Sequence, residues 1–521
     1  MRLAELVAAL SLATDLGMGQ PMEHALRTCL LAVRLAQALG VGGDDLADVY
    51  YVALLRYVGC TADAHETAAL AGGDDLGFAS WSAPLMMGDR RPWESASAPR
   101  SAGGPLPPAR GAPTVIAGTR PPSRADAARA LTAHCEVAEM LARRLGLRPT
   151  VRWALRHAFE RWDGEGFPEG LAGEAVPLAV RVCAVARDAE LLYRQGGLAM
   201  ACDVIRQRSG QGYDPRAAQA FLRHGAQLLT DGQQGQHVSA WEATLAAEPG
   251  RPVWVPSHRL HAMLEVFADF ADVKCPWMQG HSRGVAALAA AAARHSGLGD
   301  AAVVAVRHAG LLHDLGRTGV ANGIWDKPGP LTTEEWERVR LHPYLTERIL
   351  VRCGALAALA PLAAAHHERL DGSGYYRGST AAWLSREARL LAAADAYQAM
   401  TQERPHRSAL SAAGAAAQLA AEAAAGRLDP QAVEAVTAAA GGPPGRAVPR
   451  SRPAGLSERE VEVLRLVCRG CPNRVIAERL GITAKTVGHH VQHIYDKIGL
   501  SSRAAAAVFA LEHGLLATGE P

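Results

Sequence analysis

A set of histidines and aspartates in the second half of the chain has residue types and spacing that suit metal binding. All are imidazoles or carboxylates, which favour manganese, iron or zinc. His313 and Asp314 are adjacent, and neighbours on a helix point about 100° apart, so His313 could bind one ion while Asp314 reaches between two. A bridging carboxylate can hold two ions roughly 3.5–4 Å apart, where they activate a shared water and neutralise charge on a phosphoryl group. The full set is His281, His313, Asp314, His342, His366, His367 and Asp395.

Helices are the elements expected to position these side chains. Alanine dominates the apolar positions, aromatic residues make up only 5% of the chain, and β-branched runs are few. This composition favours helix over sheet. Residues 26–39 and 285–295 place apolar side chains at three- and four-residue steps, which is the period of an amphipathic helix. We therefore predict an all-α fold.

The first half of the chain contains a spacing that also occurs in the second half. From His24 to Arg56 is 32 residues (56 − 24), and from His281 to His313 is also 32 (313 − 281). The residues around these positions match as well, with Leu-Leu before and a glycine three residues after both Arg56 and His313. These matches indicate an internal duplication.

A second pair of spacings strengthens this interpretation. His134 and Asp163 are 29 residues apart (163 − 134), as are His342 and Asp371 (371 − 342). Both aspartates follow Glu-Arg and one apolar residue, and Gly-X-Gly follows each of them. Two equal spacings in matched contexts are hard to obtain by chance, so residues 1–250 are interpreted as a degenerate copy.

The degenerate copy has lost most of the candidate metal ligands. Arg56 and Tyr57 stand in place of His313 and Asp314, and the pair of adjacent histidines is replaced by Ala158-Phe159. The position of Asp395 corresponds to Arg187, with Asp188 one place later. Only His24 and His134 persist, too few for a two-metal centre. We expect no catalysis from this copy and hypothesise a regulatory or dimerisation role.

The length of 521 residues predicts about three domains at roughly 100–200 residues each. Residues 88–123 are rich in Pro, Gly, Ser and Ala and form an expected insertion in the first copy. Residues 441–455 are dense in Pro, Gly and Arg, which resist helix formation and suit a linker. The second copy then spans 256–440, and a third domain spans 456–521.

Residues 256–436 resemble the HD-GYP family, a branch of the HD phosphohydrolase superfamily. The resemblance implies an all-α fold, a centre of two or three metal ions, and hydrolysis of the bacterial messenger cyclic di-GMP. The matching motifs are HDLGRTG at 313–319, DKPGPLTTEEW at 326–336, HP at 342–343, HHERLDGSGY at 366–375, AAADAY at 392–397 and RP at 404–405.

The resemblance also implies roles for individual residues. The seven side chains of the opening set would be the metal ligands, with Asp314 bridging two ions. Asp314 and Arg317 would act in catalysis, with Arg317 stabilising charge on the substrate. Gly374 and Tyr375 match the start of the Gly-Tyr-Pro signature near the substrate entrance, so Arg317, Gly374 and Tyr375 would bind substrate.

Three residues depart from the family pattern. Tyr376 replaces the signature proline. Arg317 replaces the usual lysine; it keeps the positive charge, but a planar guanidinium is not equivalent to an ammonium. Trp277 lies where members with three metal ions have a glutamate, so we expect two divalent ions, with iron or manganese favoured. These departures leave three functions open: a cyclic di-GMP phosphodiesterase, a weakly catalytic ligand- or metal-sensing transcription factor, and a phosphohydrolase for another nucleotide.

The C-terminal segment has the layout of a helix-turn-helix. Ser457 followed by Glu460 forms a capping box that begins one helix. A short helix at 473–480 ends at a glycine, and Thr483 caps a longer helix at 484–498. A short helix, a glycine-containing turn and a longer helix are typical of DNA-binding domains of this type.

Residues 456–516 resemble the LuxR-type DNA-binding domain, through the motifs SEREVEVL, NRVIAERLGIT, KTVGHHV and DKIGLSSR. The resemblance implies four helices, a homodimer formed through the last helix, and transcriptional control through double-stranded DNA. The helix at 484–498 would enter the major groove. Its residues expected to face DNA are Lys485, Thr486 and His490. Lys497 and Arg503 are expected to contact phosphate, which would fix the register rather than read the sequence.

The overall charge, the cysteine pattern and the apolar runs indicate the type of binding partner and the compartment to expect. The formal charge is only +2, from 54 basic and 52 acidic residues, so DNA binding needs a local patch. Nine cysteines lack CxxC pairing, which fits reduced thiols. A signal peptide and a membrane span are not expected, because the apolar runs are short and interrupted by charges. We therefore expect a cytoplasmic protein that contacts no membrane.

Overall fold

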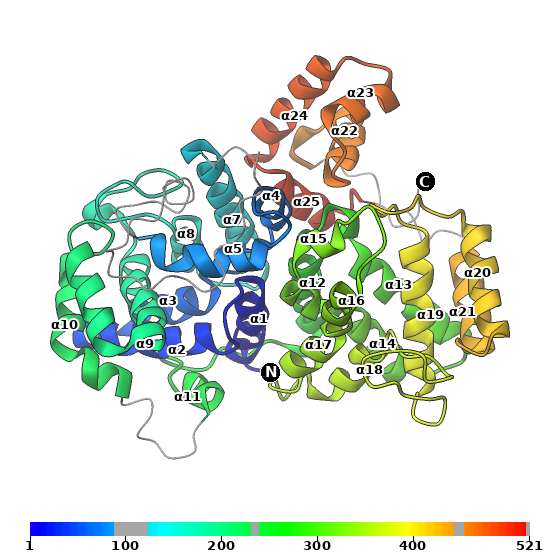
Figure 1. Ribbon diagram of the computed structural model, residues 1–521, viewed down its shortest axis with the longest axis horizontal. Coiled ribbons are helices and arrows are strands. Elements are labelled where there is room, and N and C mark those ends of the chain that lie inside the picture. Colours follow the sequence, from blue (N-terminus) through cyan, green and yellow to red (C-terminus); the bar gives the residue numbers. More distant parts are fainter. Residues whose placement is uncertain (88–122, 231–238, 442–452, 517–521) are drawn as a thin grey trace. The chain divides into compact units, whose positions relative to one another are not determined.

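The computed structural model describes residues 1–87, 123–230, 239–441 and 453–516 (Figure 1). The chain divides into two compact units, residues 1–257 and 258–521. Every regular element in the described residues is a helix, and β-pairing there is limited to isolated bridges, so the predicted all-α fold is confirmed. None of the described helices combines the length and apolarity needed to cross a membrane. The predicted insertion at 88–123 lies outside the described residues except for residue 123, and residues 442–452 of the predicted linker at 441–455 lie outside them too.

The first unit is built around four helices that pack on one another, α2, α3, α9 and α10 (Figure 1). Apolar side chains of these helices are largely buried, which gives the unit its own core. Its elements are α1 (Leu3–Gly17), α2 (His24–Ala38), α3 (Gly43–Leu55), α4 (Ala64–Leu70), α5 (Asp75–Ser82), η1 (Ala83–Leu85), α7 (Arg124–Arg144), α8 (Pro149–Arg156), η2 (Gly173–Ala175), α9 (Leu178–Arg208), α10 (Pro215–Thr230) and α11 (Ala240–Ala246).

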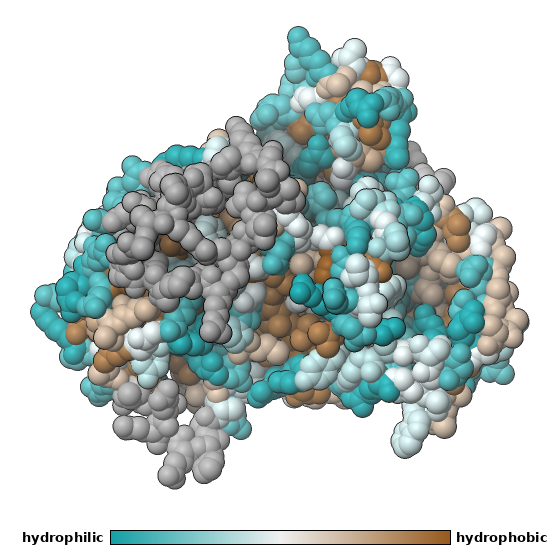
Figure 2. Space-filling view, viewed as in Figure 1, coloured by the Kyte–Doolittle hydropathy of each residue, from teal (hydrophilic) through white to brown (hydrophobic). Residues whose placement is uncertain are grey.

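The second unit has a matching core, in which α13 packs against α14, α19 and α21. Figure 2 shows a pale to tan surface over α20 and α21, which are rich in alanine. The elements before the C-terminal domain are η3 (Ser257–Arg259), α12 (Leu260–Val273), η4 (Pro276–Met278), α13 (His281–His295), α14 (Asp300–Leu312), η5 (Leu315–Gly319), α15 (Asn322–Trp325), α16 (Thr333–Arg340), α17 (His342–Leu350), η6 (Ala357–Leu359), α18 (Ala360–Ala364), α19 (Arg386–Met400), α20 (Ala412–Ala424) and α21 (Pro430–Gly441).

Corresponding helices of the two units begin and end at corresponding residues. Helices α2 and α13 both have 15 residues, begin at His24 and His281, and follow a residue with positive φ, 76° at Glu23 and 74° at Gly280. Helices α3 and α14 both have 13 residues and lead into Arg56 and His313. This agreement is what the predicted duplication requires.

The C-terminal domain has the predicted short and long helices. The capping box of Ser457 and Glu460 is present, and the Thr483 side chain caps α24 by accepting a hydrogen bond from Thr486 N. Gly481 ends α23 with a φ of 65°, a conformation that glycine adopts without strain. The elements are η7 (Pro453–Gly455), α22 (Glu458–Cys468), α23 (Asn473–Leu480), α24 (Ala484–Ile498) and α25 (Arg503–Glu512).

Candidate metal centre

The structure brings together all seven side chains that the sequence singled out in the second unit. His281 and His342 are the first residues of α13 and α17, and Asp395 lies within α19. The other four follow directly after α14 and α18. Six of the seven are at least 95% buried, and the seventh, His367, is partly exposed. A buried cluster of this kind needs cations or hydrogen bonds to compensate the loss of water.

The turn after α14 is held tightly against the start of α17. A Cβ at Gly316 would lie 2.1 Å from the carbonyl oxygen of His342, so only glycine fits there. Thr346 of α17 also bonds to this turn. Its hydroxyl donates to the carbonyl oxygen of His313 at 2.9 Å and accepts from Gly316 N at 2.9 Å. These bonds set the position of His313 relative to His342.

The carboxylate of Asp314 lies between two groups of imidazoles. Its Oδ2 atom lies 3.5 Å from Nε2 of His313 and 3.9 Å from Nε2 of His281. Its Oδ1 atom lies 3.4 Å from Nε2 of His342 and 3.7 Å from Nε2 of His366. One carboxylate therefore faces two separate sets of donors, the geometry expected for a bridging ligand.

Asp395 provides the second carboxylate of the cluster. Its Oδ1 atom lies 3.2 Å from Nε2 of His281 and 3.7 Å from Nε2 of His313. Its Oδ2 atom lies 3.7 Å from Nδ1 of His367. The donor set is thus five imidazoles and two carboxylates, which suits divalent transition metals.

Three of the imidazoles are oriented by the backbone. The Nδ1–H groups of His313, His342 and His366 donate to backbone carbonyl oxygens at 2.8, 2.6 and 2.7 Å. These bonds direct each Nε2 lone pair into the cluster, as in histidines that bind metals. Nε2 of His313 is buried and has no hydrogen-bond partner among the described residues. An orphaned acceptor here fits a divalent cation.

The protonation states of the clustered histidines and of Asp314 also favour metal binding. Burial lowers the pKa of His342 to about 4, and burial with the neighbouring His313 lowers that of His366 to about 3. Burial alone would raise the pKa of Asp314, but His313, Arg317 and the other imidazoles hold it well below its ordinary value. Neutral imidazoles beside ionised carboxylates are the forms that bind metal ions.

Arg317 and Tyr375, two of the residues expected to bind substrate, lie beside the cluster. Nη1 of Arg317 is 3.5 Å from Oδ2 of Asp314. The ring of Tyr375 lies 4.7 Å from that of His367. At position 374 the packing of the loop requires glycine, because a Cβ there would lie 2.4 Å from the backbone nitrogen of Arg369. The structure therefore places Arg317 and Tyr375 beside the cluster and gives Gly374 a role in loop packing.

Tyr376, which replaces the signature proline, anchors its loop to α17. Its hydroxyl donates to the carboxylate of Glu347, and Nη2 of Arg377 donates to the same carboxylate at 2.6 Å. These contacts hold the pKa of Glu347 below its ordinary value despite partial burial. The tyrosine that replaces the proline therefore gives this loop a hydrogen bond to α17.

Sequence reasoning missed several residues that support the cluster. Nδ1 of His281 is 2.9 Å from Oε1 of Gln402, which also accepts from Nη2 of Arg404 at 3.0 Å. Trp325 lies under the guanidinium of Arg317. Arg404 belongs to the RP motif, but no motif marks Gln402, because its contact with His281 joins segments 121 residues apart. Trp325 is only eight residues from Arg317, but no sequence pattern shows that its ring lies under the guanidinium.

In the first unit, two of the lost ligand positions hold arginines, Arg56 and Arg187, and side-chain ion pairs take the place of the metal cluster. Nδ1 of His24 pairs with Glu190. Nη1 of Arg187 pairs with Oδ1 of Asp188 at 2.8 Å, and both are buried. Arg56, also buried, faces the ring of Phe159 at 5.4 Å. This arrangement has no set of converging acceptors for a metal ion.

The residues expected to contact DNA divide into two groups. Lys485 is exposed near the start of α24, and Thr486 and His490 follow on the same helix, both partly exposed. Lys497 instead pairs with Oε2 of Glu460 at 2.7 Å. The guanidinium of Arg503 donates to the carbonyl oxygen of Cys471 at 2.9 Å. The last two side chains therefore have partners within the domain.

Comparisons with known proteins agree with this geometry. Residues 114–217 and 265–432 match the HD domain family, and residues 454–510 match the bacterial regulatory proteins of the luxR family. The chain is 30% identical to 3'3'-cGAMP-specific phosphodiesterase 3 of Vibrio cholerae, over 78% of this chain and 88% of the relative. It is 40% identical to a cyclic di-GMP phosphodiesterase of Pseudomonas aeruginosa, over 31% of this chain and 39% of the relative.

A solved structure shows the same similarity in three dimensions. The crystal structure of a cyclic GMP-AMP specific phosphodiesterase from Vibrio cholerae superposes with a TM-score of 0.57 at 26% identity. It covers 84% of this chain and 97% of the solved one. The similarity thus extends over both units.

Proposed function

Because the chain belongs to the HD-domain family and ends in a luxR-family domain, we propose that it hydrolyses a cyclic dinucleotide and couples this activity to DNA binding. The hydrolase would be residues 256–440 and the DNA-binding domain residues 456–521. Residues 1–250 would be the degenerate copy. The observation that carries the proposal is the position of Asp314, whose two oxygens face different histidines.

The seven clustered side chains are the proposed ligands of two divalent ions, iron or manganese. When bound, such ions supply a polarised phosphate and an activated water. His281 and His313 face Oδ2 of Asp314, while His342 and His366 face Oδ1. Asp395 lies beside His281 and His313. The low proton affinity of these imidazoles keeps them ready to bind.

The remaining roles follow from the surroundings of the cluster. Arg317 would donate hydrogen bonds to a phosphate oxygen and stabilise negative charge as it develops there. Tyr375 would pack against a base or ribose at the entrance. The family lysine is absent, but the guanidinium of Arg317 already points at the cluster, which supports turnover rather than binding alone.

Two cyclic dinucleotides are candidate substrates. We propose cyclic di-GMP, as the name of the Pseudomonas aeruginosa relative specifies. The alternative is 3'3'-cGAMP, favoured by the longer match to a Vibrio cholerae enzyme named as specific for it. A third possibility, a weakly catalytic ligand- or metal-sensing transcription factor, follows from the replacement of two signature residues by Arg317 and Tyr376.

The C-terminal domain supports the regulatory part of the proposal. The exposed Lys485 at the start of α24 suits contact with double-stranded DNA. LuxR-type domains read paired half-sites, so we expect a homodimer acting in the cytoplasm, where the chromosome lies. Metal or substrate bound in the hydrolase would then change operator affinity.

One experiment separates these functions. The full chain, loaded with manganese or iron, is incubated with cyclic di-GMP and with 3'3'-cGAMP, and linear products are quantified beside the Asp314→Ala variant. Metal-dependent product that is lost in the variant supports the enzyme. If neither substrate gives product, the proposed enzymatic activity is refuted. If the affinity for DNA is unchanged by metal, by cyclic dinucleotide and by Asp314→Ala, the proposed coupling is refuted.

A further inference from the structure

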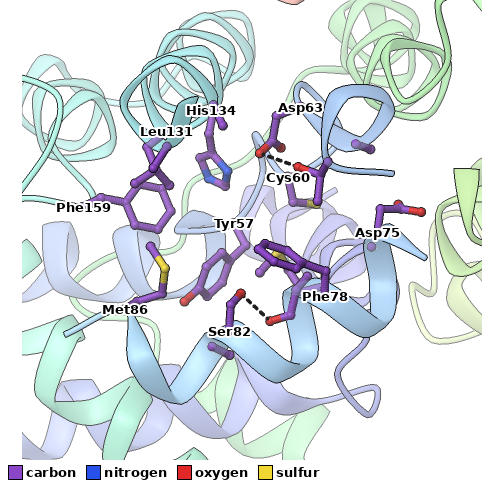
Figure 3. A pocket seen from close by; sticks show the side chains of 18 of the residues that line it. Tyr57, Cys60, Asp63, Asp75, Phe78, Ser82, Met86, Leu131, His134 and Phe159 are labelled. Atoms are coloured by element: carbon purple, nitrogen blue, oxygen red, sulfur yellow. Dashed lines mark hydrogen bonds between the residues drawn. The ribbon is translucent and has the colours of Figure 1, made fainter. Parts of the chain in front are cut away.

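The first unit contains a cavity of about 140 Å³. Figure 3 shows that its wall is formed by side chains from the end of α3, from α5 and from α7, with Phe159 closing one side. The rings of Tyr57, Phe78, His134 and Phe159 face the space, whereas the carboxylate of Asp75 points away from it (Figure 3). The wall is mainly apolar, and its largest side chains are Tyr57, Phe78, Met86, Leu131 and Phe159.

This cavity is lined by three of the seven positions that form the metal centre in the second unit. By the spacing of the two copies, Tyr57 corresponds to Asp314, and Phe159 to His367. His134 corresponds to His342, and both are held by the same packing: a Cβ at Gly59 would lie 2.0 Å from the carbonyl oxygen of His134, against 2.1 Å for the second pair. The loss of ligands has thus left an apolar chamber in their place.

A metal ion no longer fits this chamber. Its one histidine, His134, directs Nε2 to the carbonyl oxygen of Arg56 at 2.9 Å. Burial lowers the pKa of this imidazole to about 4, so His134 is neutral and donates through Nε2. The wall supplies aromatic faces instead, because the rings of His134 and Phe159 meet edge to face at 4.8 Å, and Tyr57 lies 6.1 Å from His134.

The residues that line the cavity do not suit a phosphate ligand. They include three aspartates, Asp63, Asp75 and Asp126, and neither lysine nor arginine. A cyclic dinucleotide carries two negative charges and would find no lining cation to bind its phosphates. Burial raises the pKa of Asp63 to about 7, and its Oδ2 lies 3.3 Å from the hydroxyl of Thr67. This carboxyl group is thus a hydrogen-bonding group in a mainly apolar wall.

We propose that the first unit binds a small uncharged aromatic molecule with a hydrogen-bond donor, its ring between Tyr57, Phe78 and Phe159 and its donor directed at Asp63. The size agrees, since an apolar protein cavity of roughly 150 Å³ holds a benzene ring. Aromatic rings and the thioether of Met86 pack favourably against such a ligand. The degenerate copy is then a receptor site, separate from the proposed hydrolase.

The test uses 5-fluoroindole, which is uncharged, aromatic and carries an N–H donor. Its binding to the full chain is followed by fluorine NMR, with 5-fluoroindole-2-carboxylate as the charged comparison. We expect one saturable site per chain and at least about tenfold weaker binding of the carboxylate. Absence of saturable binding, or equal binding of both compounds, would overturn the proposal.

Two substitutions locate the site. Ala79→Phe and Ala130→Phe each place a ring in the cavity from its wall and should weaken 5-fluoroindole binding at least about tenfold. Ala125→Phe, on the exposed face of α7, is the matched control and should bind like the wild type. Binding that survives both wall substitutions would place the ligand elsewhere and refute the assignment.

The hydrolase provides a check on folding that is independent of this site. Product release from cyclic dinucleotides, if the proposed function holds, should be the same in all three variants without indole, and circular dichroism confirms their helical content in any case. A chain that binds 5-fluoroindole but hydrolyses no cyclic dinucleotide would refute the proposed function alone. The reverse result would refute the receptor site alone.

Discussion

The guanidinium carbon of Arg317 lies 3.7 Å from the centre of the Trp325 ring. The same tryptophan meets the ring of His342 edge to face at 5.7 Å. Trp325 therefore links the proposed phosphate-binding arginine to a proposed metal ligand. A cation held over an indole face is stabilised by about 0.5–2 kcal/mol, enough to restrict where Arg317 points.

We predict that Trp325→Ala lowers kcat roughly three- to tenfold and leaves KM for the cyclic dinucleotide within about twofold, since Arg317 would lose its orientation. Trp325→Phe should restore most of kcat because it keeps an aromatic face. Steady-state kinetics measure both. The control is Trp336→Ala, at an exposed tryptophan on α16. Equal losses in Trp325→Ala and Trp325→Phe would contradict a positioning role.

Asp314→Asn should lower the metal content from two ions per chain to one or none. The amide cannot supply two anionic oxygens, so the two groups of imidazoles would no longer share a ligand. Elemental analysis of the purified chain measures this without any activity assay. Asp371→Asn is the matched control, because that carboxylate accepts from Ser373 N within an exposed turn. Two ions retained in Asp314→Asn would show that this residue does not bridge.

Glu368 should control the order of the loop that follows it. This carboxylate is 2% exposed and accepts from Arg377 N at 2.8 Å and from Ser379 N at 2.7 Å. Glu368→Ala removes both hydrogen bonds, and a hydrogen bond to a charged group contributes about 1.5–3 kcal/mol. We expect at least about tenfold faster hydrogen exchange in peptides covering 375–380. Unchanged exchange there, with helix α13 as the internal reference, would show that other contacts hold the loop.

Much of the candidate metal centre in the second unit could be predicted from the sequence. His313, His342 and Asp395 lie in ordered motifs, and the folded chain brings them together. The bounds of the helix at 484–498 were also predictable, because Thr483 and Gly499 are strong signals for the start and end of a helix. Local signals of this kind depend on residues a few positions apart, which a sequence displays directly.

Contacts between distant segments were not predictable. Gln402 reaches His281 across 121 positions, and a glutamine in a polar turn has no pattern that reveals this partner. The cavity in the first unit is a similar case: the loss of ligands at Tyr57 and Phe159 was visible, but the empty space between them depends on how α5 and α7 pack. Such packing is set by the tertiary fold.

Lys485 and Lys497 should differ in their effect on DNA binding. Lys485 is exposed near the start of α24, whereas Lys497 pairs with Glu460. Lys485→Ala should weaken binding to non-specific duplex DNA and reduce the slope of log K against log salt by about 1. Lys497→Ala should change that slope by less than half as much. Fluorescence anisotropy between 50 and 200 mM salt measures both, and equal slopes for the two variants would contradict this division.

The pair of Glu460 and Lys497 should make the C-terminal domain sensitive to acid. Although burial opposes it, bonds from Lys497 and Ser457 lower the pKa of Glu460 to about 2. A carboxyl group with a depressed folded pKa stabilises the fold above its unfolded value of about 4.3 and loses this contribution as the pH falls toward 2. Hydrogen exchange in α22, corrected for intrinsic rate, should therefore accelerate between about pH 4.3 and 2.

Glu460→Gln is the variant that tests this assignment. The amide can still accept the hydrogen bond from Ser457 N but does not titrate, so the acceleration of exchange in α22 over this range of pH should be smaller than in the wild type. Glu462→Gln, at a side chain that is 51% exposed on the same helix, is the matched control and should retain the wild-type response. If Glu460→Gln and the wild type respond alike, other carboxyl groups set the acid sensitivity of this domain.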